Sequence, residues 1–220
     1  MKTSNPNDQD QINTGIHFLF RYPSLYLLFQ YVMGSRHKYR MYINEFMELS
    51  VGKRILDIGC GTADILNYLP DNVEYVGYDM SSNYISYAKK RFRERAKFKN
   101  ERVNEMTPIN DEPFDIILAD GLLHHLNDDE AKTLFEIGYA MLNDEGFMLT
   151  VDPTFVEGQG MFDKYVTSMD RGRHVRTPEG YIDVAQQVFP NVNMSTRLFK
   201  MFIPLSGCIL KCYKNGDSNA

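Results

Sequence analysis

The sequence has no tryptophan, only three cysteines and no long apolar run. Cys60, Cys208 and Cys212 are too few and too unevenly spaced for a disulfide framework, which excludes the small disulfide-stabilised class of secreted protein. In an extended strand Cys208 and Cys212 lie about 13 Å apart, too far to ligate one ion, so we expect no metal site. Residues 1–11 lack the apolar core of a secretion signal. No segment reaches the roughly 18 apolar residues of a membrane span, so we expect a cytoplasmic protein without membrane contact.

Positive charge is also scarce. The formal net charge is -5 over 220 residues, and the basic residues form no single long run. A protein that binds a phosphate backbone usually carries a strongly positive face, so we do not expect a nucleic-acid partner. The hydrophobic content of 43% is typical of a globular domain with its own core. We therefore expect a monomer or homodimer that binds a small molecule.

Aromatic residues, by contrast, are concentrated near the N-terminus. A polar tail at 1–13 precedes a segment at 14–49 that is rich in phenylalanine and tyrosine. Pro23 favours a helix start and Gly34–Ser35 a break before a second helix, so this segment is predicted to be an N-terminal helical cap. Its aromatic side chains either pack on the core or line a ligand pocket. The candidates for contact with a substrate in this segment are Tyr22, Tyr26 and Arg40.

From residue 50 onward, short apolar runs alternate with amphipathic segments. Strands are expected at 54–58, 73–78, 114–119 and 147–151. Helices are expected at 62–69, 81–95 and 128–142, the last of them ended by Gly146. This alternation predicts an α/β protein with a Rossmann-like, mostly parallel sheet and helices on both faces.

The last third of the chain is less regular. Helices are expected near 160–170 and 177–188, the second capped by the sequence that begins at Thr177, and strands at 194–202 and 205–213. We predict one domain over 50–214, in which 153–190 is an insertion that closes the substrate site.

A glycine turn follows the first expected strand, in the sequence Asp57-Ile58-Gly59-Cys60-Gly61. Glycines at these two positions allow a tight turn and a close approach of a ligand to the backbone. A dinucleotide site requires a third glycine at position 64, where this chain has Asp64, and an acid there repels a pyrophosphate. Asp57 and Asp64 instead suit a ligand with a cationic amino group. Asp79 ends the second strand, where a carboxylate can accept both hydroxyls of a ribose or cap the next helix.

These features, with the run from Phe114 through Asp120-Gly121-Leu122-Leu123-His124-His125-Leu126, resemble the class I S-adenosylmethionine-dependent methyltransferases over residues 50–155. The resemblance implies a seven-stranded sheet with an antiparallel last strand, and S-adenosylmethionine as cofactor with S-adenosylhomocysteine as product. It implies that Asp57, Gly59, Cys60 and Gly61 hold the methionine end of the cofactor, together with Asp120 and Gly121. It further assigns the ribose to Asp79, and the adenine to Met80, Asn104 and Glu105. The chain departs from the family pattern at Ala63, the usual third glycine, and lacks the usual Gly-Asp pair before Phe114.

His124 and His125 are the catalytic candidates. A base is needed only if the methyl acceptor must lose a proton, and histidine is suited to that task near neutral pH. The alternative is that an imidazole packs inside the protein and fixes the loop.

Arginines supply the candidates for anion binding. Arg173 and Arg176, with Asp152 nearby, are predicted to contact an acceptor that bears a carboxylate or phosphate, because arginine binds such groups through two hydrogen bonds. Alternatively they are solvated or paired with Asp152, Asp163 or Asp170. The basic residues of the cap that are predicted to reach the cofactor carboxylate are Arg36, His37, Lys38 and Arg40.

The sequence thus predicts methyl transfer to oxygen or nitrogen of a small molecule. The alternatives are an RNA or protein methyltransferase, an inactive homologue that binds the nucleoside and, more distantly, a nicotinamide oxidoreductase.

Overall fold

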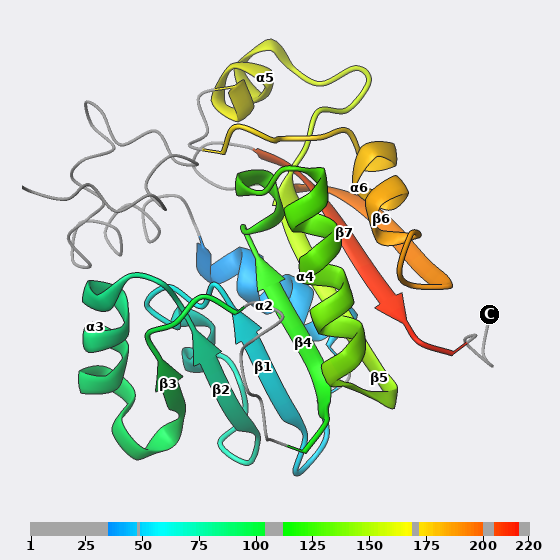
Figure 1. Cartoon of the computed structure of the whole chain (residues 1–220). Coiled ribbons are helices and arrows are strands. Elements are labelled where there is room, and N and C mark those ends of the chain that lie inside the picture. Colours follow the sequence, from blue (N-terminus) through cyan, green and yellow to red (C-terminus); the bar gives the residue numbers. More distant parts are fainter. Residues whose placement is uncertain (1–34, 48, 104–111, 169–171, 200–204, 216–220) are drawn as a thin grey trace, which may run out of the picture.

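The computed structural model describes residues 35–47, 49–103, 112–168, 172–199 and 205–215. These residues form a seven-stranded sheet with the order β3-β2-β1-β4-β5-β7-β6 (Figure 1). Its strands are β1 (Arg54–Ile58), β2 (Glu74–Tyr78), β3 (Lys97–Lys99), β4 (Phe114–Asp120), β5 (Leu142–Pro153), β6 (Asn191–Phe199) and β7 (Leu205–Tyr213). β7 pairs antiparallel with both β5 and β6, and the other pairs are parallel. The predicted mostly parallel sheet with an antiparallel last strand is confirmed.

The described residues contain five α-helices, three of which follow a capping side chain. They are α2 (Ser35–Phe46), α3 (Ser82–Phe92), α4 (Asp128–Met141), α5 (Met161–Ser168) and α6 (Pro178–Ala185). α4 starts with a capping box, in which Asn127 and Glu130 each bond the other's backbone N–H. At the start of α6, Thr177 accepts the N–H of Gly180 and is followed by proline, as the sequence predicted.

The two faces of the sheet carry separate apolar clusters, because successive strand residues point to opposite sides. In β1, Ile55 packs in one cluster with residues of α2 and α3, and Leu56 packs in the other with residues of α4 and α6. Figure 1 shows α4 crossing one face of the sheet and α2 lying behind it. Helices therefore cover both faces, as expected.

Two local expectations were wrong. The segment at 62–69 contains only a short 3-10 helix, η3 (Asp64–Asn67), preceded by Ala63 at φ 56°. The helix expected at 128–142 is α4, but Gly146, expected to end it, lies within β5. A Cβ on Gly146 would come within 2.6 Å of the Asp115 carbonyl oxygen, so this glycine permits close contact between neighbouring strands.

The parallel strands β1, β2, β4 and β5 all end at one edge of the sheet, called here the carboxyl edge. α5 lies beyond this edge in Figure 1. None of the described helices is long and apolar enough to span a membrane.

Candidate active site

The glycine turn lies at the carboxyl edge, immediately after β1. Gly59 and Gly61 have φ values of 79° and 55°, which glycine adopts without steric cost. The Gly59 N–H donates to the Tyr78 carbonyl at 2.8 Å, which holds the turn against β2. A Cβ on Gly61 would meet no atom of the described residues within 4 Å, so none of these residues fills the space beside the turn. Cys60 does not face that space, because its Sγ packs against Gly77.

Asp79 lies beside this turn at the end of β2. One carboxylate oxygen accepts the Gly61 N–H at 2.9 Å and the other accepts the Ser81 N–H at 2.7 Å. The α3 cap is Ser81, whose side chain accepts the Tyr84 N–H, so Asp79 does not cap that helix. Burial raises the pKa of Asp79 above its usual value. Met80 follows it and is half exposed, at 49%.

Asp57 is buried just before the turn, at 4% exposure. The Tyr75 hydroxyl donates a hydrogen bond to its carboxylate. Burial raises the pKa of Asp57 to about 7; the Tyr75 hydrogen bond opposes this rise, while the nearby Asp120 and Asp79 charges add to it. Several carboxylates thus converge on a poorly solvated place, which favours a cation there.

A cation reaches this place from α2. The Lys38 ammonium lies 2.9 Å from each carboxylate oxygen of Asp120, and the Tyr42 hydroxyl donates to Asp120 at 3.2 Å. Lys38 and Tyr42 are one helical turn apart, so they share a face of α2. The sequence included Lys38 among four basic residues that could reach the cofactor carboxylate, and it did not single out Tyr42 or Tyr75. Tyr42 lies in an amphipathic helix and Tyr75 in a strand, but neither pattern indicates which residue the tyrosine hydroxyl contacts.

Asp64 is engaged elsewhere. Its carboxylate pairs with Arg91 of α3 and accepts a hydrogen bond from the Thr62 hydroxyl. Asp64 was predicted to bind the cofactor's amino group, but in the structure it is paired with Arg91.

The histidine turn follows β4 at the same edge, in the 3-10 helix η5 (Leu123–His125). His124 Nδ1 lies 2.8 Å from Oδ1 of Asp152, at the end of β5, and the His124 backbone N–H donates to the same oxygen at 3.2 Å. The His125 ring lies 4.0 Å from the His124 ring, centroid to centroid, and is half-buried. Asp152, predicted to contact an acceptor or an arginine, is instead a partner of His124.

The arginine cluster is only partly available to a ligand. Arg176 donates to the carbonyl oxygens of Leu123, Leu126 and His174 and pairs with Asp128. It therefore holds the histidine turn in place. Its ion-pair partner, Asp128, is not one of the aspartates that the sequence analysis considered. The exposed arginines among the candidates are Arg40 and Arg173.

Some predicted site residues cannot be placed. Tyr22, Tyr26, Asn104 and Glu105 lie outside the described residues, as does the side chain of Arg36. Gly121 is described: it follows Asp120 at φ 68°, and its N–H donates to the Val151 carbonyl. In the part of the chain that the structure describes, no group of three or more histidine, cysteine or acidic side chains could hold a metal.

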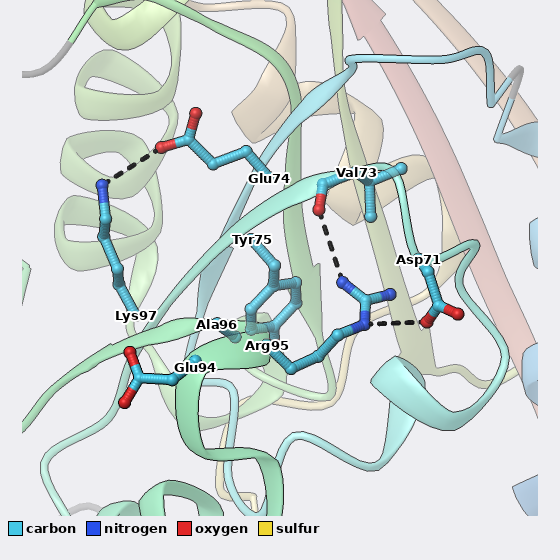
Figure 2. A pocket seen from close by; sticks show the side chains of 8 residues that line it. All are labelled: Asp71, Val73, Glu74, Tyr75, Glu94, Arg95, Ala96 and Lys97. Atoms are coloured by element: carbon cyan, nitrogen blue, oxygen red, sulfur yellow. Dashed lines mark hydrogen bonds and ion pairs between the residues drawn. The ribbon is translucent and has the colours of Figure 1, made fainter.

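A hollow of about 370 Å³ lies at the opposite, amino edge of the sheet, where β2 and β3 begin. Its lining residues are Asp71, Val73, Glu74, Tyr75, Glu94, Arg95, Ala96 and Lys97. Figure 2 shows the Arg95 guanidinium bonded to Asp71 and to the Val73 carbonyl, and Lys97 paired with Glu74. These charges satisfy one another, and ligands of open parallel sheets bind at the other edge.

Known proteins share this domain and this fold. Residues 55–146 match the family model described as "Methyltransferase domain". The YcgJ protein of Bacillus subtilis has a similar structure, with a TM-score of 0.63 and 16% identity over 82% of this chain and 100% of that one. NodS, an N-methyltransferase from Bradyrhizobium japonicum crystallised with S-adenosylhomocysteine, has a TM-score of 0.62 and 14% identity over 80% of this chain and 86% of that one.

A larger structure also shares the fold. Phosphoethanolamine N-methyltransferase 2 from Haemonchus contortus, solved with phosphomonomethylethanolamine and S-adenosylhomocysteine, has a TM-score of 0.66 and 14% identity. The similarity covers 91% of this chain but only 60% of that one. A comparison with curated proteins finds no match. The methyltransferase-domain match over residues 55–146 and the order of the sheet confirm the resemblance to the class I S-adenosylmethionine-dependent methyltransferases seen in the sequence.

Proposed function

We propose that the carboxyl edge binds S-adenosylmethionine and transfers its methyl group to oxygen or nitrogen of a small molecule. The observation that carries this proposal is the placement of Asp79 against the glycine turn, where its carboxylate accepts the Gly61 N–H. A carboxylate so placed suits the two hydroxyls of a ribose, because each can donate to one oxygen. Met80, half exposed next to it, suits the adenine face.

The amino-acid end of the cofactor would lie on the opposite side of the turn. Its ammonium group suits the buried Asp57, whose charged form is disfavoured by burial and by the nearby Asp120 and Asp79 charges, and the half-buried Asp120. Its carboxylate suits Lys38, whose ammonium already lies at this edge. A pyrophosphate, as in a nicotinamide dinucleotide, would instead meet this group of acids.

The bound sulfonium supplies an activated methyl group, so the protein's main task is to align the acceptor with it and exclude water. We place the acceptor on the histidine side of the edge, next to His124 and His125. Arg40 and Arg173 are the exposed arginines available for a carboxylate or phosphate on the acceptor.

The test compares S-adenosylhomocysteine with NAD by calorimetry and thermal unfolding. S-adenosylhomocysteine at about 100 times its Kd should stabilise the protein by about 2.7 kcal/mol, and NAD should have no effect. Asp79→Ala should weaken S-adenosylhomocysteine binding at least about 100-fold, because it removes two hydrogen bonds to a charged group. Stabilisation by NAD alone would refute the proposal. Undiminished binding by the variant would refute the ribose assignment. A screen of hydroxyl and amine metabolites with labelled methyl donor then identifies the acceptor.

A further inference from the structure

The two outer strands of the sheet differ in how they are protected from pairing with another chain. Native proteins usually shorten, charge or interrupt an edge strand, because its outward N–H and C=O groups can bind a further strand. β3 follows this rule, since it has three residues and two of them are Lys97 and Lys99. β6 at the other edge has nine residues and contains neither proline nor lysine. The long edge of the sheet is therefore the one that is open to pairing.

The backbone of β6 is regular along its whole length. All nine residues pair with β7 in one antiparallel register without a bulge, from Asn191 opposite Tyr213 to Phe199 opposite Leu205. Figure 1 shows β6 beside β7, at the side of the sheet away from β3. Among the residues that the structure describes, no strand pairs with the outer side of β6. Alternate N–H and C=O groups of an antiparallel strand point away from its neighbour, so those of β6 are directed outward.

Charge does not prevent two copies of β6 from approaching each other. Arg197 is the one charged side chain of the strand, and it is engaged within its own chain. It lies 3.6 Å from Glu45 of α2, and its guanidinium lies 5.7 Å from the centre of the Phe46 ring. The chain as a whole has a formal net charge of -5, which makes two copies repel each other. The uncharged strand is therefore a favourable place for them to meet.

One face of β6 also carries large apolar side chains that are not fully covered. Val192 packs in the apolar cluster on the side of α4 and α6, whereas Phe199 packs in the cluster on the other side. Since strand residues alternate between faces, Met194 and Leu198 share the face of Val192. These two side chains are 37% and 53% exposed. The outer strand therefore offers apolar surface next to its outward backbone groups.

We propose that β6 pairs antiparallel with β6 of a second copy of this chain, which joins the two sheets into one. Side chains directly opposite each other in such a pair lie on the same face. With Ser195 on the two-fold axis, Val192 of each copy lies opposite Leu198 of the other, and Met194 lies opposite Thr196. One register thus covers both exposed apolar side chains with apolar or β-branched partners, which favours a second copy over an unrelated extended peptide.

The same register is acceptable on the other face of the sheet and leaves both active sites complete. Asn193 lies opposite Arg197, so no two like charges face each other. β6 runs parallel to β5 and ends at the carboxyl edge, because each of them pairs antiparallel with β7. A two-fold axis perpendicular to the sheet places the carboxyl edges of the two copies on opposite sides. Binding of S-adenosylhomocysteine should therefore not depend on the pairing, and this inference does not rest on the proposed function.

The first experiment is sedimentation velocity of the full chain from about 1 to 100 µM, a range that includes weak protein interfaces. The wild-type protein should form a dimer as its concentration rises. Met194→Lys with Leu198→Lys should raise the dissociation constant of the dimer at least about tenfold, because apolar pairs are lost and ammonium groups are brought together. Val51→Lys with Met161→Lys is the matched control, since these apolar side chains are 82% and 90% exposed outside β6. A wild-type monomer at every concentration, or an equal effect of the two double variants, would overturn the proposal.

The second experiment tests the register by cross-linking and does not require the lysine variants to fold. Ser195→Cys should form a disulfide-linked dimer on mild oxidation, because opposite Cβ atoms lie about 4.5–5.5 Å apart. Asn193→Cys alone should not, since its counterpart lies about 13 Å along the strands, but it should cross-link when mixed with Arg197→Cys. The wild-type protein is the blank, because its three cysteines are buried. A dimer that Ser195→Cys does not cross-link would form through another surface and would overturn the proposal.

Discussion

The two edges of the sheet carry the same kinds of charged side chain in opposite surroundings. At the amino edge, Glu74 pairs with Arg54 and Lys97, and its side chain is 42% exposed. At the carboxyl edge, Lys38 and Asp120 are 18% and 12% exposed, and Asp57 is buried. Solvated pairs contribute little to stability, whereas buried carboxylates without full compensation are destabilising. The difference indicates that the carboxyl edge keeps its charges for binding rather than for folding.

Asp57→Asn should produce the largest change in stability that this comparison predicts. Because burial raises the pKa of Asp57 to about 7, the folded protein is favoured by a neutral side chain at this position. That contribution is complete below about pH 4 and is lost as the pH rises through 7. The variant, which is neutral at every pH, should therefore be more stable than the wild type by about 2–4 kcal/mol at pH 8 and equally stable at pH 4.

Urea unfolding of the ligand-free protein at the two pH values measures this difference. The same variant should bind S-adenosylhomocysteine more weakly, because the amino group loses a carboxylate. A variant that is less stable than the wild type at pH 8 would contradict the idea that the carboxyl edge sacrifices stability for binding.

How much of this edge could be predicted from the sequence depends on whether the signal was local. The strand predicted at 205–213 coincides with β7. Its nine residues are all buried or half-buried, and Pro204 precedes them in the sequence. The glycine turn was also recognisable, since Gly59 and Gly61 supply its backbone conformation. The positive φ of Ala63 was not, because alanine carries no such signal, and this residue shortens the expected helix at 62–69 to one 3-10 turn.

Contacts between distant residues were beyond the sequence. Lys38 and Asp120 are 82 residues apart, and their pairing depends on where α2 meets the end of β4. His124 and Asp152 are 28 residues apart, and they meet only because β4 and β5 are adjacent and in register. The sequence named all four residues as site candidates but could not give the pairing that distinguishes their roles.

Lys38→Met sharpens the comparison by removing the cation from the carboxyl edge. If Lys38 binds the cofactor carboxylate, the variant should bind S-adenosylhomocysteine about tenfold more weakly, the value of one hydrogen bond to a charged group. An analogue of S-adenosylhomocysteine that lacks the carboxylate should bind the variant as well as the wild type or better, since Asp120 is then free for the amino group. Calorimetry with the two ligands measures the difference. An equal loss for both would mean that Lys38 only holds Asp120 in place.

Glu74→Gln should have the smallest effect, because it alters the amino edge. The hydrogen bond from Arg54, and secondarily that from Lys97, lowers the pKa of Glu74, so its ionised form stabilises the fold above pH 4 and this contribution is lost on acidification. Since Glu74 is largely solvated, the free energy of unfolding at pH 7 should fall by less than about 0.5 kcal/mol. Binding of S-adenosylhomocysteine, followed in the same calorimetric assay, should not change. A marked loss of binding would mean that β2, which is followed by Asp79 at the carboxyl edge, couples the two edges. The contrast between the edges would then no longer separate binding from folding.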